Sequence, residues 1–145
     1  MDFAVRLAGR AGQRSAQGFF SDDWHSRLKE DGTEATEIDV AVEELLREEL
    51  SRRVPDDGIF GEQGGSTSGS SGRRWTIDPV NGTKYFTHRV PLLSNDLVYE
   101  DEYGPAAGVI NMPLSRQVTV AGRGPGGAGS CRVRTRTSAR AAAPR

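Results

Sequence analysis

Two acidic side chains follow short apolar stretches in the middle of the chain. Glu62 comes at the end of GIFGE (58–62), and Asp78 comes at the end of WTID (75–78). In folds that contain a sheet, ligands collect where strands give way to loops. Carboxylate oxygens are ligands that suit Mg²⁺. The sequence therefore predicts a cation site that includes Glu62 and Asp78.

The residues directly after Asp78 have the features of an anion site. Asn81 is a favourable helix N-cap, and Gly82 and Thr83 can present backbone N–H groups at a helix start. Such a start favours a negative group, phosphate in particular. A cation site and a phosphate site within one turn of chain indicate metal-assisted hydrolysis of a phosphate ester.

Each of these residues also has a simpler structural interpretation. Glu62 and Asp78 could be solvated acids at strand ends, which is the usual fate of acids. Asn81 could serve only as a helix cap, and Thr83 only as a first-turn residue. Asp39 could do no more than close a capping box. The motif context favours the functional interpretation for Glu62, Asp78 and Thr83, whereas both interpretations stay open for Asn81 and Asp39.

The apolar spacing of the chain predicts the elements that position these residues. Helices are expected over 2–20 and 36–53, and Thr36 and Asp39 have the spacing of a capping box. Strands are expected at 58–63, 73–79, 92–99, 106–112 and 117–121, with a flexible loop at 64–72 and a short helix at 81–89. The fold class is therefore α+β, with two N-terminal helices packed on a mainly antiparallel sheet.

Composition places limits on the class of protein. The 145 residues suffice for one modest domain with a core. No apolar run approaches the roughly 18 to 20 residues that span a bilayer. The N-terminus lacks the features of a signal peptide, so we expect a cytoplasmic protein with no membrane partner. The single cysteine, Cys131, excludes an internal disulfide and a multi-cysteine zinc site.

Charge divides the chain into two unequal parts. Residues 122–145 hold six arginines and no acids, whereas residues 1–121 hold the other thirteen basic and all twenty acidic residues, a net charge of −7. The second part also has almost no large apolar residues, so we expect a domain over 1–121 and a disordered basic tail over 122–145. The tail could bind nucleic acid through counterion release. It lacks the interleaved aromatics of a stacking platform, which makes that a weaker alternative.

Four motifs, over about residues 3–124, occur in the order and spacing of the inositol monophosphatase-like family. The motifs are KEDGTEATEID, GIFGEQ, WTIDPVNGTKYF, and GVINMP followed by AGRG. The chain resembles this family, and most of all its actinobacterial histidinol-phosphatase branch. The family pattern of Gly-Glu-Glu, then Asp-Pro-(Ile/Val)-Asp-Gly-Thr, is specific. The resemblance implies the N-terminal part of the sugar-phosphatase-like αβαβα sandwich.

The resemblance also implies an activity and the residues that perform it. The activity is Mg²⁺-dependent phosphomonoester hydrolysis, in which water attacks phosphorus directly. The implied metal ligands are Glu62, Asp78, the carbonyl of Val80, and Asn81. The implied catalytic residues are Asp39, Thr83 and Glu62, and the N–H groups of Gly82 and Thr83 hold phosphate. The implied lid loop contains Lys29 and Asp31. The expected partner is a small phosphorylated metabolite, histidinol phosphate or inositol phosphate, and the expected assembly is a homodimer.

The chain departs from the family pattern at several positions. Asn81 replaces the second aspartate of the motif and Gln63 the second glutamate, and Asn95 and Asp96 add polarity to a strand that the family usually keeps apolar. The resemblance covers only the first half of the family's sequence, whereas the second half carries a further metal-binding aspartate and most substrate contacts. The alternative function is therefore that of a truncated, inactive relative that retains at most residual binding of metal and phosphate.

Overall fold

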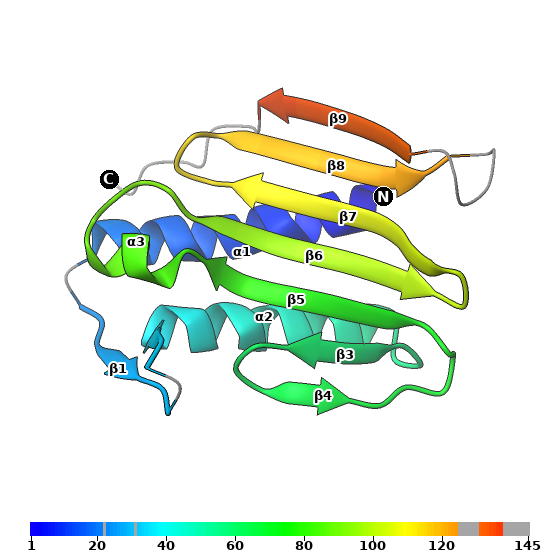
Figure 1. Cartoon of the computed structure of the whole chain (residues 1–145), viewed down its shortest axis with the longest axis horizontal. Helices are drawn as coiled ribbons and strands as arrows, with labels where there is room; N and C mark the ends of the chain where they lie inside the picture. The colour runs from blue at the N-terminus through cyan, green and yellow to red at the C-terminus, as the bar shows by residue number, and fades with distance from the viewer. Residues whose placement is uncertain (22, 31, 125–130, 138–145) are drawn as a thin grey trace.

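The described residues form a seven-stranded sheet with two long helices packed on it (Figure 1). The structure is a computed structural model and describes residues 1–21, 23–30, 32–124 and 131–137. The helices are α1 (Asp2–Phe20), α2 (Glu37–Arg53) and the short α3 (Thr83–Thr87). The strands of the large sheet are β3 (Gly58–Gly61), β4 (Gly65–Thr67), β5 (Arg74–Asn81), β6 (Ser94–Asp101), β7 (Gly104–Met112), β8 (Gln117–Arg123) and β9 (Cys131–Thr137). A separate hairpin pairs β1 (Ser26–Leu28) with β2 (Glu34–Thr36).

The strand order of the large sheet is β4-β3-β5-β6-β7-β8-β9. The pair β3–β5 is parallel, and the other described neighbours are antiparallel. Because β3 and β5 run in the same direction, they end at the same edge of the sheet, where β6 begins (Figure 1). The chain segments that follow β3 and β5 therefore lie next to each other.

The two long helices cover one face of the sheet. Helix α2 packs on β3 and β5, α1 packs on β6 and β7, and the helices also contact each other (Figure 1). The sheet residues that join them in the core come from alternate positions, as a half-buried strand requires. They include Trp75, Ile77, Leu97, Val109, Val118 and Val120. Both helices have the bounds that the spacing predicts, to within one residue.

A capping box begins α2. The backbone N–H and the hydroxyl of Thr36 donate to the Asp39 carboxylate, and the Asp39 N–H donates to the Thr36 hydroxyl. The capping box predicted from the sequence is therefore confirmed. It fixes the first turn of α2 at the edge of the sheet where β3 and β5 end.

The register of β5 changes at Pro79. Asp78 pairs with Asp96 of β6, whereas Asn81 pairs with Ser94, so β5 has one residue more than β6 between these pairs. A proline cannot donate to the strand ladder, and an extra residue bends a strand and turns its side chains. This β-bulge gives the residues after Asp78 an orientation that regular pleating would not produce.

Asn95 of β6 points toward the helices and anchors the bulge. Its side-chain N–H groups donate to the Pro79 carbonyl at 2.5 Å and to the Ser15 hydroxyl of α1 at 2.8 Å. Asn111 of β7 extends this buried group, because its amide donates to the Ala8 carbonyl at 3.0 Å and to Asn95 at 3.3 Å. The unusual polarity of this strand therefore has a structural role at Asn95.

Part of the predicted disordered tail is ordered. Gly122 and Arg123 belong to β8, and residues 131–137 form β9, which pairs along the whole of β8. The disorder prediction is wrong for these residues because Val133, Thr135 and Thr137 are β-branched and alternate with arginine, a pattern that suits an edge strand. Residues 125–130 and 138–145 of the predicted tail lie outside the described residues.

The α+β class and the mainly antiparallel sheet are confirmed. The structure adds the β1–β2 hairpin to the prediction, and it places β4 within the predicted loop 64–72. Within the described part of the chain, no helix is both long enough and apolar enough to cross a membrane.

Candidate active site

The candidate site lies at the edge of the sheet where β3 and β5 end. Four elements meet there: Glu62 follows β3, Asp78 lies near the end of β5, Asp39 lies in the first turn of α2, and Thr83 begins α3 (Figure 1). The parallel pairing of β3 with β5 brings Glu62 and Asp78 together. The contacts of α2 with both strands bring Asp39 to the same edge. The predicted site residues therefore converge from separate parts of the sequence.

Thr83 connects α3 to the buried Asp39. Its hydroxyl oxygen lies 2.8 Å from Asp39 Oδ1 and 3.0 Å from the Val80 carbonyl oxygen. Asp39 is fully buried, and burial raises the pKa of its carboxyl, although hydrogen bonds from Thr36 and Thr83 oppose that rise. A buried carboxylate bonded to a hydroxyl is an arrangement that can accept a proton through that hydroxyl.

Asp78 is held in an environment that disfavours its charged form. Burial, together with the negative charges of Glu62, Asp96 and Asp39, raises the pKa of Asp78 to about 7, while the backbone N–H of Val80 acts in the opposite direction. Its Oδ1 atom is buried and has no hydrogen-bond partner. The charged form of a partly buried carboxylate near other acids is stabilised when it binds a cation.

Asn81 does not cap α3, so the helix-cap prediction is wrong. It is the last residue of β5, the N-cap position is held by Gly82, and no side chain among the described residues caps this helix. The bulge turns Asn81 toward β6, where its amide donates to Asp96 Oδ2 at 2.8 Å. The Asn81 side chain therefore contacts a carboxylate on the neighbouring strand.

Gly82 is required by the backbone that joins β5 to α3. Its φ angle is +95°, in the left-handed region that side chains other than glycine rarely adopt. A Cβ atom at this position would also lie 2.9 Å from the Leu92 carbonyl oxygen. Gly82 thus permits the sharp turn that places Thr83 against Asp39.

Lys29 reaches the site from the hairpin, where it follows β1. Its ammonium group forms an ion pair with Glu62, whose side chain is 43% exposed. The predicted lid residue Lys29 therefore contacts the predicted metal ligand Glu62 directly. Asp31, the other predicted lid residue, lies outside the described residues.

Glu43 is a supporting residue that the sequence analysis missed. It is buried one turn after Asp39 on α2, and it accepts hydrogen bonds from the backbone N–H groups of Gln63 and Gly64, both at 2.7 Å, and from Arg47 Nε at 2.8 Å. These bonds hold the turn that carries Glu62. The signal was the spacing of Asp39, Glu43 and Arg47 at four-residue intervals, which places three polar side chains on one face of a helix.

The donor set suits a hard divalent cation. Within the described ranges, no group of three or more His, Cys, Asp or Glu side chains is placed to hold a metal ion. Mg²⁺ does not need such a cage, because it is usually bound through one or two carboxylates, water and substrate phosphate. Asp78 Oδ1 and Asp96 Oδ1 are both buried and have no hydrogen-bond partner, so both oxygens are available to coordinate a cation.

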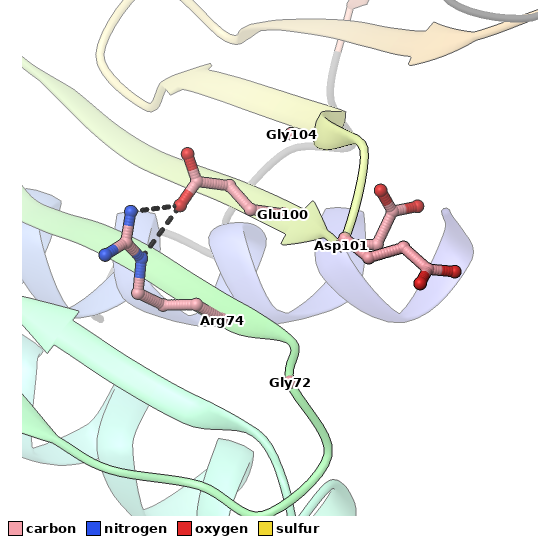
Figure 2. A pocket seen from close by; sticks show the side chains of 6 residues that line it. Gly72, Arg74, Glu100, Asp101 and Gly104 are labelled. Atoms are coloured by element: carbon pink, nitrogen blue, oxygen red, sulfur yellow. Dashed lines mark hydrogen bonds and ion pairs between the residues drawn. The ribbon is translucent and has the colours of Figure 1, made fainter.

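A depression at the opposite end of the sheet has different chemistry (Figure 2). Arg74 and Glu100 form an ion pair across it, and Asp101 is paired with Arg123 at 3.0 Å. The lining residues are Gly72, Arg74, Glu100, Asp101, Glu102 and Gly104. Because its principal charges are paired with each other, this depression has no unpartnered buried carboxylate comparable to Asp78.

The model of the inositol monophosphatase family matches residues 1–143. A histidinol-phosphatase of Chlorobaculum parvum is 39% identical over 126 residues, which are 87% of this chain and 49% of that protein. A histidinol-phosphatase of Mycobacterium tuberculosis is 35% identical over 123 residues, which are 85% of this chain and 47% of that protein.

A solved structure also matches this chain over about half of its own length. The extragenic suppressor protein SuhB of Bartonella henselae superposes with a TM-score of 0.82 at 27% identity, covering 86% of this chain and 49% of that one. The fold therefore matches the N-terminal half of such structures. The chain spans about half the length of the curated relatives it matches.

Proposed function

Because the chain belongs to the inositol monophosphatase family, a family of phosphomonoester hydrolases, we propose that it hydrolyses a small phosphate monoester in a Mg²⁺-dependent reaction. The observation that carries this proposal is the hydrogen bond between Thr83 and the buried Asp39, next to a carboxylate, Asp78, whose Oδ1 has no partner. Residues that accept a proton and residues that suit a cation thus lie side by side.

Thr83 and Asp39 would activate water. The Thr83 hydroxyl donates its hydrogen to Asp39 Oδ1, which leaves a lone pair on its oxygen to accept a hydrogen bond from an attacking water molecule. As water attacks phosphorus, its proton passes to Thr83, and the Thr83 proton passes to Asp39. The raised pKa of Asp39 favours this transfer, because a carboxylate that binds a proton more readily is a better general base.

Glu62, Asp78, the Val80 carbonyl and the Asn81 side-chain oxygen would hold the cation. When bound, Mg²⁺ supplies Lewis-acid chemistry that activates water and neutralises charge on the phosphate. Asp78 is the central donor, since it faces the charges of Glu62, Asp96 and Asp39. In the structure the Lys29 ammonium group is ion-paired with Glu62. We propose that Lys29 moves away from this carboxylate when the cation binds.

The backbone N–H groups of Gly82 and Thr83 would bind the phosphate oxygens. The φ angle of +95° at Gly82 turns the chain at this point, directly after the Asn81 end of β5. Histidinol phosphate and inositol phosphate are the substrates we propose, the first because the two curated relatives described above are histidinol-phosphatases.

Phosphate release from both substrates, with and without Mg²⁺, tests the proposal. We expect Mg²⁺-dependent release that Asp78→Asn abolishes. Glu102→Gln is the matched control, because Glu102 is an exposed acid in the turn between β6 and β7, at the other end of the sheet. Release that is independent of Mg²⁺, or equal in wild type and Asp78→Asn, would exclude the proposed reaction.

A second candidate function is cation and phosphate binding without turnover. Asn81 supports it, because its amide lacks the charge of a carboxylate and is already bonded to Asp96. The Lys29–Glu62 ion pair supports it as well, since a cation must compete with the ammonium group. Calorimetric binding of Mg²⁺ in a protein that releases no phosphate would favour this second function.

A further inference from the structure

Asp96 lies beside Asp78 in the sheet. The two residues are direct partners in the antiparallel pair β5–β6, so their side chains project from the same face. Like charges placed directly opposite each other destabilise a sheet. A pair of acids at this position therefore has an energetic cost that the strands themselves do not explain.

Each of the two carboxylates has one oxygen without a partner. Asp78 Oδ1 and Asp96 Oδ1 are both buried, and neither has a hydrogen bond within the described structure. Buried polar atoms are almost always hydrogen-bonded, and a bound water or ion is one of the explanations for an exception. A divalent cation between these directly paired residues would satisfy both oxygens at once and offset the repulsion of the two carboxylates.

Asn81 holds Asp96 in place. Its amide donates to Asp96 Oδ2 at 2.8 Å, which leaves Oδ1 as the oxygen that lacks a partner. This bond fixes the carboxylate in one orientation, as groups around metal ligands commonly do. The neutral Asn81 on β5 and the charged Asp96 on β6 thus act together, and Asp96 supplies the negative charge that Asn81 lacks.

The face that carries Asp96 is accessible to solvent. Ile110, the partner of Asp96 on β7, projects from the same face and is 48% exposed. Helices α1 and α2 pack on the opposite face, with the core residues Ile77 and Leu97. An ion can therefore approach this face of the sheet from solution.

We propose that Asp96 is a ligand for a divalent cation, Mg²⁺ or Mn²⁺, shared with Asp78 and oriented by Asn81. The carboxylate that position 81 lacks is thereby supplied from the neighbouring strand. The inference rests on the proposed function for the use of this cation in hydrolysis, but cation binding is measurable without any substrate.

Calorimetric titration of the chain of residues 1–145 with Mn²⁺, in the absence of substrate, tests the proposal. We expect Asp96→Asn to weaken Mn²⁺ binding by at least about tenfold, the scale on which changes near a metal site act. Glu100→Gln is the matched control, because it removes a carboxylate from the same strand and face but from a residue paired with Arg74. Glu100→Gln should leave Mn²⁺ affinity unchanged.

A double variant makes the test specific. Asn81→Asp combined with Asp96→Asn exchanges the two side chains and keeps both the charge and the hydrogen bond, so we expect it to recover most of the lost affinity. Circular dichroism spectra and thermal melts establish that each variant is folded. Wild-type affinity in folded Asp96→Asn, or an absence of binding in the wild type, would overturn the assignment.

Failure of this inference is distinguishable from failure of the proposed function. If Mn²⁺ binds through Asp96 but no phosphate is released from any monoester, the ligand assignment stands and the hydrolase proposal fails. If Mg²⁺-dependent hydrolysis occurs and Asp96→Asn alters neither Mn²⁺ affinity nor the Mg²⁺ dependence, the hydrolase proposal stands and the assignment of Asp96 fails.

Discussion

The Thr83 hydroxyl lies 2.8 Å from Asp39 Oδ1 and so joins the first turn of α3 to the first turn of α2 across 44 positions of sequence. Asp39 is also the residue that closes the capping box of α2. One carboxylate thus has two tasks: Oδ2 stabilises a helix, and Oδ1 faces the candidate site. The capping interpretation and the catalytic interpretation of Asp39 are therefore compatible.

Removal of the Thr83 hydroxyl should separate catalysis from folding. Thr83→Val preserves the shape of the side chain but cannot relay a proton, so we expect kcat for phosphate release to fall by about 10²- to 10⁴-fold. Thr83→Ser keeps the hydroxyl and should retain most of the activity. Steady-state kinetics on the three proteins, at saturating Mg²⁺, make the comparison. Equal kcat values for Thr83→Val and Thr83→Ser would show that the hydroxyl takes no part in the reaction.

The pH dependence of stability should identify Asp78. Because its pKa is raised to about 7 in the folded protein, the native state holds a proton that the unfolded chain has already lost between about pH 4 and 7. Stability in metal-free buffer should therefore decrease as pH rises through this window and then level off. Asp78→Asn should reduce this slope, as measured by urea unfolding across the window.

Asp101→Asn is the control for that measurement, because the pKa of Asp101 is shifted downward, opposite to that of Asp78. The backbone N–H of Tyr103 and the Arg123 side chain hold the pKa of Asp101 below its ordinary value. Its contribution is present above the unfolded value and is lost only as pH falls through the folded value. The variant should therefore keep the wild-type slope between about pH 5 and 7. An identical slope in wild type and Asp78→Asn would contradict the raised pKa of Asp78.

Substitution of Gly82 should disturb the turn between β5 and α3. Gly82→Ala forces a side chain into the left-handed region and against the Leu92 carbonyl, so we expect a loss of about 1–3 kcal/mol in the free energy of unfolding. Gly9→Ala is the control, because Gly9 lies within α1 and a Cβ there meets no atom within 4 Å. That change should stabilise the protein by up to about 1 kcal/mol. Urea denaturation of both variants gives the comparison, and a neutral Gly82→Ala would refute the strain argument.

Loss of the Glu43 carboxylate should loosen the turn that carries Glu62. Glu43→Ala removes the acceptor for two backbone N–H groups and for Arg47, so we expect the free energy of unfolding to fall by at least about 1.5–3 kcal/mol. Glu43→Gln keeps one acceptor oxygen and should cost less. Chemical denaturation measures the stability, and Mn²⁺ titration measures the effect on Glu62. Unaltered stability in Glu43→Ala would mean that other contacts hold the turn.

The sequence predicted those features of the fold that depend on local pattern. The apolar spacing of α1 and the capping box of α2 are properties of short segments, and both appear in the structure as expected. The strand β9 was missed because few large apolar residues mark it and its stability comes from pairing with β8. Strand β4 was missed for the same reason, since glycine and serine dominate its sequence and β3 supplies its hydrogen bonds.

Candidate residues such as Asp78 and Thr83 could be named from the sequence, but the contact of Asn81 with Asp96 could not. Asp78 and Thr83 lie in one motif and Glu62 in another, whereas the orientation of Asn81 depends on the bulge between Asp78 and Asn81. A bulge is a relation between two strands, so no single segment reveals it. The contact between Asn81 and Asp96 was beyond sequence reasoning for that reason.

The parallel pairing of β3 with β5 has a consequence for how the chain tolerates change. Gly61 faces Ile77 in this pairing, so Glu62 and Asp78 each follow a matched residue. Side chains in a strand alternate between faces, and a shift of one residue would turn every side chain of one strand to the wrong side. A single-residue insertion in either strand should therefore separate the two acids, even where the protein still folds. An insertion in the loop 68–73 that joins β4 to β5 falls outside both strands, so it should leave this register and the separation of the two acids unchanged.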